Sequence, residues 1–414
     1  MKTFQSYFAI AATSIVLLLI PISQAQAACN DATPEPIEQV HLPGHVFTPI
    51  PSKDGCWVFV SVTQQPDPGS SAGVAVLRRD SGKMNLLRVA AIKDGHPTGM
   101  VLSHDGSLLI VADQDDVVFF DVEKLTSNHP QPLLGRINVG KGAGAIFVNV
   151  TSDDRFLFVS DEADANAEPA ITVINLEKAR GASGFGQDSI VGKIPTGRAP
   201  VGLVFSPDQR FLYATNEVSP TNSGWPIKCR IEGSHSPAEP RNPEGALLVI
   251  DVKRAEADPS HAVLATVPSG CSPVRLQISP TGDRIYTTVR AENALFVFDT
   301  ARLTGDPLHA QIARVSVGAA PVGIEVIEDG TRIVTANSNR VLGPQAAQEL
   351  TVVDASRILE GSSAVIGAIP AGAFPRELRT SFDGQTLFLT NFNSNTLEVI
   401  DLRRLSALIV ARKK

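Results

Sequence analysis

The chain has 414 residues, of which 43% are hydrophobic and 19% are charged, and its formal net charge is −7. This mildly acidic balance argues against a nucleic-acid-binding surface, which needs a basic stripe of Lys and Arg. Length alone would suggest two or three domains, but internal repeats favour one continuous repeat architecture.

The N-terminus predicts a cleaved signal peptide. Lys2 gives a positive start, and an uncharged, largely apolar stretch follows from Phe8 to Ile22. Ala25-Gln26-Ala27 then offers small residues at the positions that a signal peptidase reads. An N-terminal membrane anchor is the alternative, but the apolar stretch is near the lower length limit for a span. We therefore predict a signal peptide over residues 1–27, a mature domain over residues 28–414, and a secreted or periplasmic location without a membrane span.

A turn signal recurs along the rest of the chain, and a short β-rich strand follows each copy. A typical copy reads Ser103-His104-Asp105-Gly106. The seven copies begin at Ser52, Ser103, Thr151, Ser206, Ser279, Ile327 and Ser381. A further strand ends in Asp or Asn in six of the seven copies, as at Asp251. Gly-x-x-Pro turns lead into the next copy at Gly197–Pro200, Gly270–Pro273, Gly318–Pro321 and Gly372–Pro375.

These repeats predict the blades of a β-propeller. Each unit holds four short strands with tight turns, and the spacing of roughly 50 residues matches the period of a blade. A ring removes the two exposed edges that an open stack of sheets would leave. We therefore predict an all-β, seven-bladed propeller whose ring is closed by an N-terminal strand, Ile37–Leu42, as the missing outer strand after Asp401. The competing closing strand is Leu408–Val410.

One interval between copies is longer and contains an insertion over residues 218–244, which is too irregular for an extra blade and is predicted to be a loop. The Gly-x-x-Pro connections and the loops after the second strand of each blade lie on one side of a propeller, called the funnel face from here on. The insertion emerges on this face.

Four cysteines remain after signal cleavage, namely Cys29, Cys56, Cys229 and Cys271. In an oxidising compartment an even count is typical of disulfides, and four cysteines allow three connectivities. Metal binding is the weaker reading, because the chain has no C-x-x-C pair and no C-x-x-C-H motif. Since Cys229 and Cys271 are both placed on the funnel face, we predict the pairs Cys229–Cys271 and Cys29–Cys56.

Several polar residues are expected to converge on the funnel face. The predicted ligand-binding residues are His96, Asn216, Asn337, Arg376 and Asn391. Arginines in the funnel of an acidic protein suit a carboxylate, a phosphate or a lactone oxygen. The alternative is that these polar side chains pair with one another and tie the blades together.

The repeat pattern resembles the YVTN-repeat and lactonase-like seven-bladed propellers over nearly all of the mature chain. The segment 213–217 reads YATNE and is similar to the family's YVxNE, while 286–290 reads YTTVR and is similar to YVSNR. Pro273-Val274-Arg275 resembles the family's PRH. The resemblance implies catalytic roles for Glu217 as a base, and for Arg275 and Arg290 in stabilising an oxyanion.

One departure from the family pattern concerns the histidine of PRH. Leu276 follows Arg275, and Glu377 follows Arg376, so no proton-transfer residue near neutral pKa is evident there. We therefore predict a monomeric scaffold that binds a small anionic ligand or a protein partner through its funnel face, with a lactonase-type hydrolase as the alternative. No cofactor or metal is predicted, because the acidic run 161–166 lacks the Gly and the distal Glu of a calcium-binding EF-hand loop.

Overall fold

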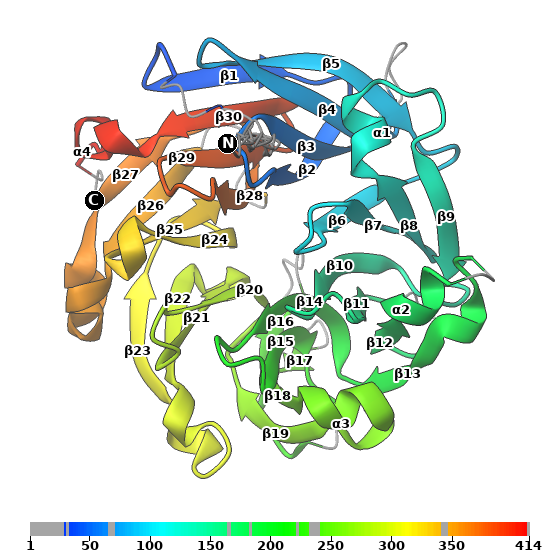
Figure 1. Cartoon of the computed structure of the whole chain (residues 1–414). Helices are drawn as coiled ribbons and strands as arrows, with labels where there is room; N and C mark the ends of the chain where they lie inside the picture. The colour runs from blue at the N-terminus through cyan, green and yellow to red at the C-terminus, as the bar shows by residue number, and fades with distance from the viewer. Residues whose placement is uncertain are drawn as a thin grey trace, which may run out of the picture.

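The computed structural model describes residues 29, 33–64, 71–163, 167–181, 184–220, 223–231, 241–340 and 347–411. These residues form seven antiparallel four-stranded sheets, arranged as the blades of a β-propeller (Figure 1). The predicted signal peptide over residues 1–27 lies outside the described residues. Within the described part of the chain, no helix has the length and apolar character needed to cross a membrane.

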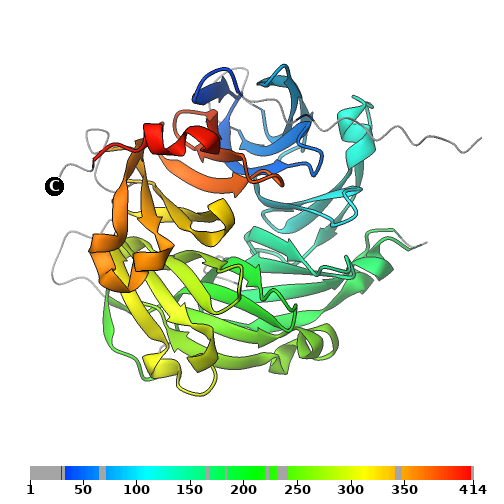
Figure 2. The same ribbon diagram turned by 60° about the vertical axis from the view of Figure 1, so that its left-hand side comes forward.

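The four strands of each blade run outward from the axis of the ring, as Figures 1 and 2 show. The innermost strands are β2 (His45–Pro51), β6 (Pro97–Leu102), β10 (Ala145–Val150), β14 (Arg198–Phe205), β20 (Pro273–Ile278), β24 (Pro321–Ile327) and β28 (Pro375–Thr380). The second strands are β3 (Trp57–Thr63), β7 (Leu108–Asp113), β11 (Phe156–Asp161), β15 (Phe211–Val218), β21 (Arg284–Val289), β25 (Arg332–Asn337) and β29 (Thr386–Asn391). The third strands are β4 (Gly73–Asp80), β8 (Asp116–Asp121), β12 (Ala170–Asn175), β18 (Ala246–Asp251), β22 (Ala294–Asp299), β26 (Glu349–Asp354) and β30 (Thr396–Asp401). The outer strands are β5 (Lys83–Ala91), β9 (Leu133–Asn138), β13 (Ile190–Pro195), β19 (Val263–Pro268), β23 (Gln311–Ser316), β27 (Val365–Pro370) and β1 (Ile37–His41).

Short helices follow the third strands, and the repeated Asp or Asn at the end of these strands caps them. The α-helices are α1 (Val122–Thr126), α2 (Leu176–Ala179), α3 (Val252–Ala257) and α4 (Leu405–Leu408). The 3-10 helices are η1 (Gln187–Ser189), η3 (Pro259–His261), η4 (Arg290–Glu292), η5 (Thr300–Arg302), η6 (Pro307–His309), η7 (Glu328–Gly330), η8 (Ala355–Ala364) and η9 (Leu402–Arg404). The Asp121 carboxylate, for example, accepts a hydrogen bond from the Lys124 backbone N–H at 3.0 Å. This motif residue is therefore structural.

The Ser-x-Asp-Gly turn joins the innermost and second strands of a blade, as between β6 and β7. The Ser103 hydroxyl donates to Asp105 Oδ1 at 2.5 Å and accepts from the Leu108 backbone N–H at 2.9 Å. Gly106 has a φ of +73°, a left-handed conformation that glycine adopts without strain. The turn signal therefore fixes the reversal of the chain through its own side chains.

The hydrophobic residues form continuous runs in the strands near the axis, whereas the outer strands are more polar, and burial explains this difference. Every residue of β7 is buried, because neighbouring blades cover both faces of the sheet. The outer strand β9 has one face in solvent, and its residues are mostly exposed. The core therefore consists of apolar layers between adjacent blades, such as the cluster that contains Phe119 of one blade and Val148 and Leu157 of the next.

The ring closes through its N-terminal strand, and this prediction is confirmed. β1 pairs antiparallel with β30, from Ile37 opposite Ile400 to His41 opposite Thr396, so that the blue and red ends of the chain meet in one blade (Figure 1). Gln39 Nε2 also donates to Glu398 Oε1 at 3.0 Å. The competing segment does not close the ring, because Val410 forms an isolated bridge to Ala368 in the preceding blade.

Both predicted disulfides are present. Cys29 is bonded to Cys56 and Cys229 to Cys271, with Cα atoms 4.7 and 5.3 Å apart. The insertion, expected as a loop, contains a short hairpin of β16 (Ile227–Arg230) and β17 (Arg241–Pro243). The Cys229–Cys271 disulfide joins this hairpin to the connection before β20.

Candidate functional site

Seven equivalent backbone positions near the start of the innermost strands form a layer at the funnel end of the central channel. The strand register aligns these positions. In each blade, a residue of the innermost strand pairs with a residue near the end of the second strand, as Pro200 does with Asn216 and Pro375 with Asn391. The position in the layer is the next residue of the innermost strand. The residues are Phe47, Thr98, Ile146, Val201, Val274, Val322 and Arg376. Among these seven described residues, Arg376 alone is charged, and it replaces the apolar side chain that most blades use.

Arg376 lies in a cage of aromatic rings. Its guanidinium carbon is 3.8 Å from the ring centroid of Phe47, 5.4 Å from that of Phe392 and 5.6 Å from that of Phe374. Its Nε is buried and has no hydrogen-bond partner among the described residues. Burial, together with the like charges of Arg275 and Arg340, lowers the pKa of Arg376 to about 9, so the group is charged at neutral pH.

The next layer down the channel holds a buried ion pair. Arg275 and Glu377 occupy equivalent positions, since the backbone N–H of each donates to the threonine hydroxyl of its own second strand, at 3.1 and 3.2 Å. Arg275 Nε donates to Glu377 Oε1 at 2.7 Å, and the two side chains are 5% and 1% exposed. The blade between them has Gly323 at this level, where an added Cβ would clash with the Arg376 backbone. The pair thus links two blades that are not neighbours.

A second ion pair joins the adjacent blades four and five on the funnel face. Arg290 donates to both carboxylate oxygens of Glu217, at 2.9 and 2.7 Å, which is the bidentate geometry of a strong pair. Both residues line a cavity of about 640 Å³ together with Glu162, Arg198 and Arg230. The negative charge of Glu162, which lines this cavity, also acts to raise the pKa of Arg376, although Arg376 itself is not among the lining residues.

The structure brings together two of the three residues predicted to be catalytic. Glu217 and Arg290 meet at the cavity, whereas Arg275 lines a different cavity, of about 200 Å³, inside the channel. The reason is their position along the strands. Arg275 lies two residues after the start of the innermost strand β20. Glu217 and Arg290 each come directly after the last residue of the second strand that pairs with the third strand, at the funnel face. Glu377, rather than Glu217, is the carboxylate that Arg275 binds.

The three asparagines predicted to bind a ligand are fully buried within their blades. Their amide nitrogens bond to groups of the same blade: Asn216 to the Val218 carbonyl, Asn337 to Thr351 and Asn391 to Thr396. Each amide also packs against the first glycine of a Gly-x-x-Pro turn, at Gly197, Gly318 and Gly372, where an added Cβ would clash with it. These contacts give the asparagines a packing role, and ligand contact through them stays a prediction.

His96 lies apart from the cavity. Its side chain is exposed, and its backbone N–H donates to Asp113 Oδ1 at 2.5 Å. Burial raises the pKa of the Asp113 carboxyl. The structure therefore places His96 on blade two, and nothing in its contacts connects it to Arg376 or Glu217.

Three residues of the site were missed from the sequence. Glu377 could have been found, because the repeat alignment puts it at the same position as Arg275 with the opposite charge. Arg198 is the exposed first residue of β14 and lies within a Gly-x-x-Pro turn, a pattern that indicates a turn and not a binding residue. Arg230 had no signal, since the insertion has no counterpart in the other repeats.

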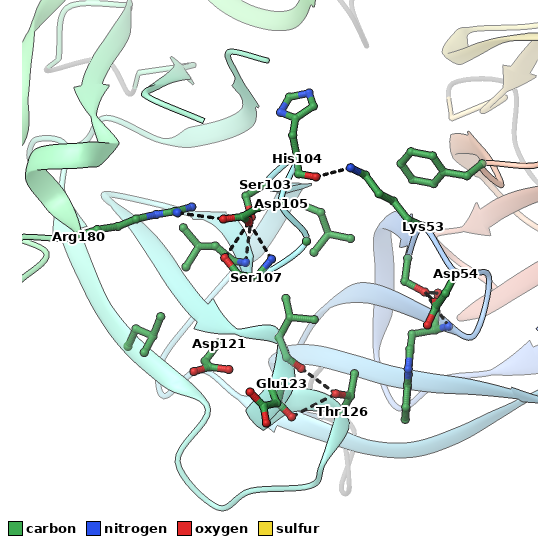
Figure 3. Close-up of a pocket in the computed structure, with 18 of the residues that line it drawn as sticks. Lys53, Asp54, Ser103, His104, Asp105, Ser107, Asp121, Glu123, Thr126 and Arg180 are labelled. Carbon is green, nitrogen blue, oxygen red and sulfur yellow. Dashed lines mark hydrogen bonds and ion pairs between the residues drawn. The ribbon is translucent and has the colours of Figure 1, made fainter. Parts of the chain in front are cut away.

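A larger cavity, of about 1000 Å³, opens on the opposite face between blades one and two (Figure 3). Several of its charged side chains are bonded to protein groups: Arg180 pairs with Asp105 at 3.4 Å, and Lys53 donates to the His104 carbonyl (Figure 3). The Asp105 carboxylate also accepts bonds from Ser103 and Ser107, which lower its pKa despite its partial burial. Because these charges have partners, the funnel face is the better candidate for a ligand site.

Comparison with known proteins supports the fold. No protein-family model matches the chain, and no curated protein matches it. Among solved structures, a chain of hydrazine synthase from Kuenenia stuttgartiensis is similar, with a TM-score of 0.62 and 17% identity over 87% of this chain and 96% of that one. A chain of the mitotic checkpoint complex is also similar, with a TM-score of 0.61 and 16% identity over 97% of this chain and 99% of that one. At these identities the likeness shows the seven-bladed β-propeller fold alone.

Proposed function

We propose that this chain is an extracytoplasmic binding scaffold whose funnel face holds a small anionic ligand or an anionic group of a protein partner. The observation that carries the proposal is Arg376, the charged member of an otherwise uncharged layer, caged by three phenylalanines and without an ion pair to a described residue. Arg376 is half-buried, and a partly desolvated charge without an ion-pair partner is unfavourable. A ligand that supplies the missing negative charge therefore gains this energy.

The chemistry of Arg376 favours a planar or tetrahedral oxyanion. The ring of Phe47 covers one face of the guanidinium, so its plane is fixed before a ligand arrives. A fixed guanidinium offers two parallel N–H donors to a carboxylate or a phosphate. The funnel-face cavity of about 640 Å³, which Glu217 and Arg290 line, falls within the size range of small-molecule sites.

An extracytoplasmic location is part of the proposal. It is supported by the N-terminal sequence pattern over residues 1–27 and by the two disulfides, which form and persist in oxidising compartments. Detection of the mature N-terminus at residue 28 in the exported protein tests it. Protein that retains residues 1–27 in the cytoplasm would contradict it.

Calorimetric titration of the purified mature protein tests ligand binding. The probes are glucuronate, citrate and inorganic phosphate, with glucose as the uncharged counterpart of glucuronate. We expect at least one anion to bind and glucose not to bind. The Arg376→Gln variant should bind at least about tenfold more weakly with an unchanged melting temperature, because it loses a charge that has no protein partner.

Arg78→Gln is the matched control, since Arg78 also stacks on an aromatic ring, at 5.7 Å from Trp57, but lies near the end of β4, away from the funnel face. It should bind the anion as the wild type does. The proposal fails if the wild type binds none of the anions, or if Arg376→Gln binds as tightly as Arg78→Gln.

The resemblance to lactonases suggests a second function, the opening of a lactone with Glu217, Arg275 and Arg290. The geometry gives it less support, because Glu217 is fully engaged by Arg290 and Arg275 is bound to Glu377. Acid release from gluconolactone in a pH-stat, with and without EDTA, tests this alternative. Turnover that disappears in Glu217→Gln would favour it over the binding scaffold.

A further inference from the structure

The hairpin β16–β17 belongs to no blade, and it forms one wall of the funnel-face cavity. Arg230 and Ile231 from the first arm and Asn242 from the second arm line the cavity. The arms pair with each other, with Cys229 opposite Asn242 and Arg230 opposite Arg241. The position of this hairpin therefore sets both the shape and the charge of that side of the cavity.

Two polar contacts hold the base and the second arm of the hairpin. Arg198 Nη2 donates to Asn242 Oδ1 at 2.7 Å, and Lys228 forms an ion pair with Glu244 at 2.5 Å. Lys228 is 54% exposed, so this ion pair contributes little. The firmest attachment of the first arm is the disulfide from Cys229, which is 4% exposed, to Cys271.

The turn that receives this disulfide also holds the cavity's ion pair. The Arg290 backbone N–H donates to the Ser272 carbonyl at 2.9 Å, and the Cys271 N–H donates to Glu292 Oε1 at 3.0 Å. Arg290 in turn binds both oxygens of Glu217. The disulfide thus fixes the hairpin to the segment that positions Arg290.

Arg230 is the next residue after the disulfide-bonded Cys229. Its side chain is exposed at the cavity, and it has no ion pair with a described residue. Because Glu217 and Arg290 neutralise each other, Arg198 and Arg230 outweigh Glu162 among the remaining charges that line the cavity. A negatively charged ligand in this cavity therefore meets Arg230 on the hairpin side.

We infer that Arg230 is a ligand-binding residue of the funnel face, and that the Cys229–Cys271 disulfide positions it, so that ligand affinity depends on the redox state of this disulfide. The inference rests on the proposed function and adds a regulation to it. A dithiol reductant would transfer two electrons and two protons to the disulfide, giving two cysteine thiols and the oxidised reductant. The first arm of the hairpin then loses its covalent link to the turn before β20.

The first test separates the role of Arg230 from a general effect of charge. We expect Arg230→Gln to bind the anionic probe about tenfold more weakly than the wild type in calorimetry, with the same melting temperature. Arg254→Gln is the matched control, because Arg254 is an exposed arginine of the same blade that lies on the helix α3 and outside the cavity. Equal affinities of these two variants would overturn the assignment of Arg230.

The second test uses the two disulfides as each other's control. Cys229→Ser/Cys271→Ser should bind the anionic probe about tenfold more weakly, and dithiothreitol should lower the affinity of the wild type to the same level. Cys29→Ser/Cys56→Ser removes a disulfide at the start of β3, next to a turn of the opposite face, and should keep the wild-type affinity. Circular dichroism checks that each variant retains the sheet signal.

The outcomes distinguish the two proposals. If the wild type binds no anion, the proposed function fails. If the wild type binds an anion and Cys229→Ser/Cys271→Ser binds it equally well, the redox dependence is wrong and the proposed function stands. If both double variants lose affinity alike, the effect is one of global stability and the positioning role of Cys229–Cys271 is also wrong.

Discussion

The central channel and the funnel face hold the same kinds of charged residue in different surroundings. In the channel, Arg275 and Glu377 are almost completely buried and are bonded to each other. On the funnel face, the Glu217–Arg290 pair is 13% and 11% exposed beside a cavity, and Arg376 has no ion pair with a described residue. The channel pair also lines a cavity, of about 200 Å³, but its side chains are only 5% and 1% exposed. We therefore expect the channel charges to stabilise the ring, and the proposed binding role falls to the funnel-face charges.

The largest effect on stability is expected from Glu377→Gln. Removing this charge leaves Arg275 buried without its carboxylate, which lowers the free energy of unfolding by about 3–5 kcal/mol. Urea denaturation measures the change. Glu177→Gln is the control, because Glu177 is 74% exposed in its ion pair with Arg155 and should change stability by less than about 1 kcal/mol. Equal effects in the two variants would show that the channel pair is not a structural link.

A second prediction concerns Asp161, which is buried at the funnel end of β11. Burial raises its pKa from 3.8 to about 6, so the folded protein binds this proton more tightly than the unfolded chain does. The resulting stabilisation is present below pH 4 and is lost as the pH rises through 6. Asp161→Asn should therefore raise the free energy of unfolding by up to about 3 kcal/mol at pH 8 and leave it nearly unchanged at pH 3.

The repeat itself provides the reason to expect that this asparagine fits. In blade six the residue equivalent to Asp161 is Asn337, whose amide donates to the Thr351 hydroxyl. In the blade of Asp161, Thr172 is equivalent to Thr351 and donates to Asp161, so an asparagine at position 161 finds the same partner. Urea denaturation of both proteins at the two pH values gives the result. A gain of the same size at pH 3 and pH 8 would contradict the role of the charge.

The smallest effect on stability is expected from Glu217→Gln. The Arg290 side chain it leaves behind borders a cavity that water can enter, so the free energy of unfolding should fall by about 1–3 kcal/mol, less than in Glu377→Gln. The freed positive charge of Arg290 should also tighten the binding of the anionic probe in calorimetry. A stability loss in Glu217→Gln as large as that in Glu377→Gln would break the contrast between channel and funnel face.

The fold could be predicted almost completely because its signals are local and repeated. The Ser-x-Asp-Gly turn holds its own hydrogen bonds, and the Asp at the end of the third strand caps the helix that follows. The closing strand and both disulfides followed from the ring, since the last blade lacked an outer strand and the cysteines were sorted by face. The β16–β17 hairpin was missed, because its strands are short, polar and without a repeat partner.

The site was harder to predict because side chains on equivalent positions do not meet equivalent partners. Counting along the repeat correctly put Glu217 beside Arg290, which lie on adjacent blades. It gave no hint that Arg275 would reach past blade six to Glu377, because the repeat pattern does not specify which side chains meet across the channel between blades that are not neighbours. The asparagines at the strand ends looked available in the sequence and are buried in the packing of the blade connections.

Ring closure also has a mechanical consequence. The β1–β30 pair joins residues that are far apart in the chain, since Gln39 and Glu398 are separated by 359 residues. Ile37, the first residue of β1, lies opposite Ile400, near the end of β30, so the outer ends of the two strands lie at the same edge of the blade. A force that pulls Pro36 away from Leu402 would act on the hydrogen bond between Asp401 and Pro36 first, and then on the others one after another. Antiparallel strands loaded in this way peel apart rather than shear. The β1–β30 pair that closes the ring therefore resists thermal opening, which must break all its hydrogen bonds together. It is weaker against tension applied to the outer ends of the two strands, which breaks the bonds one at a time.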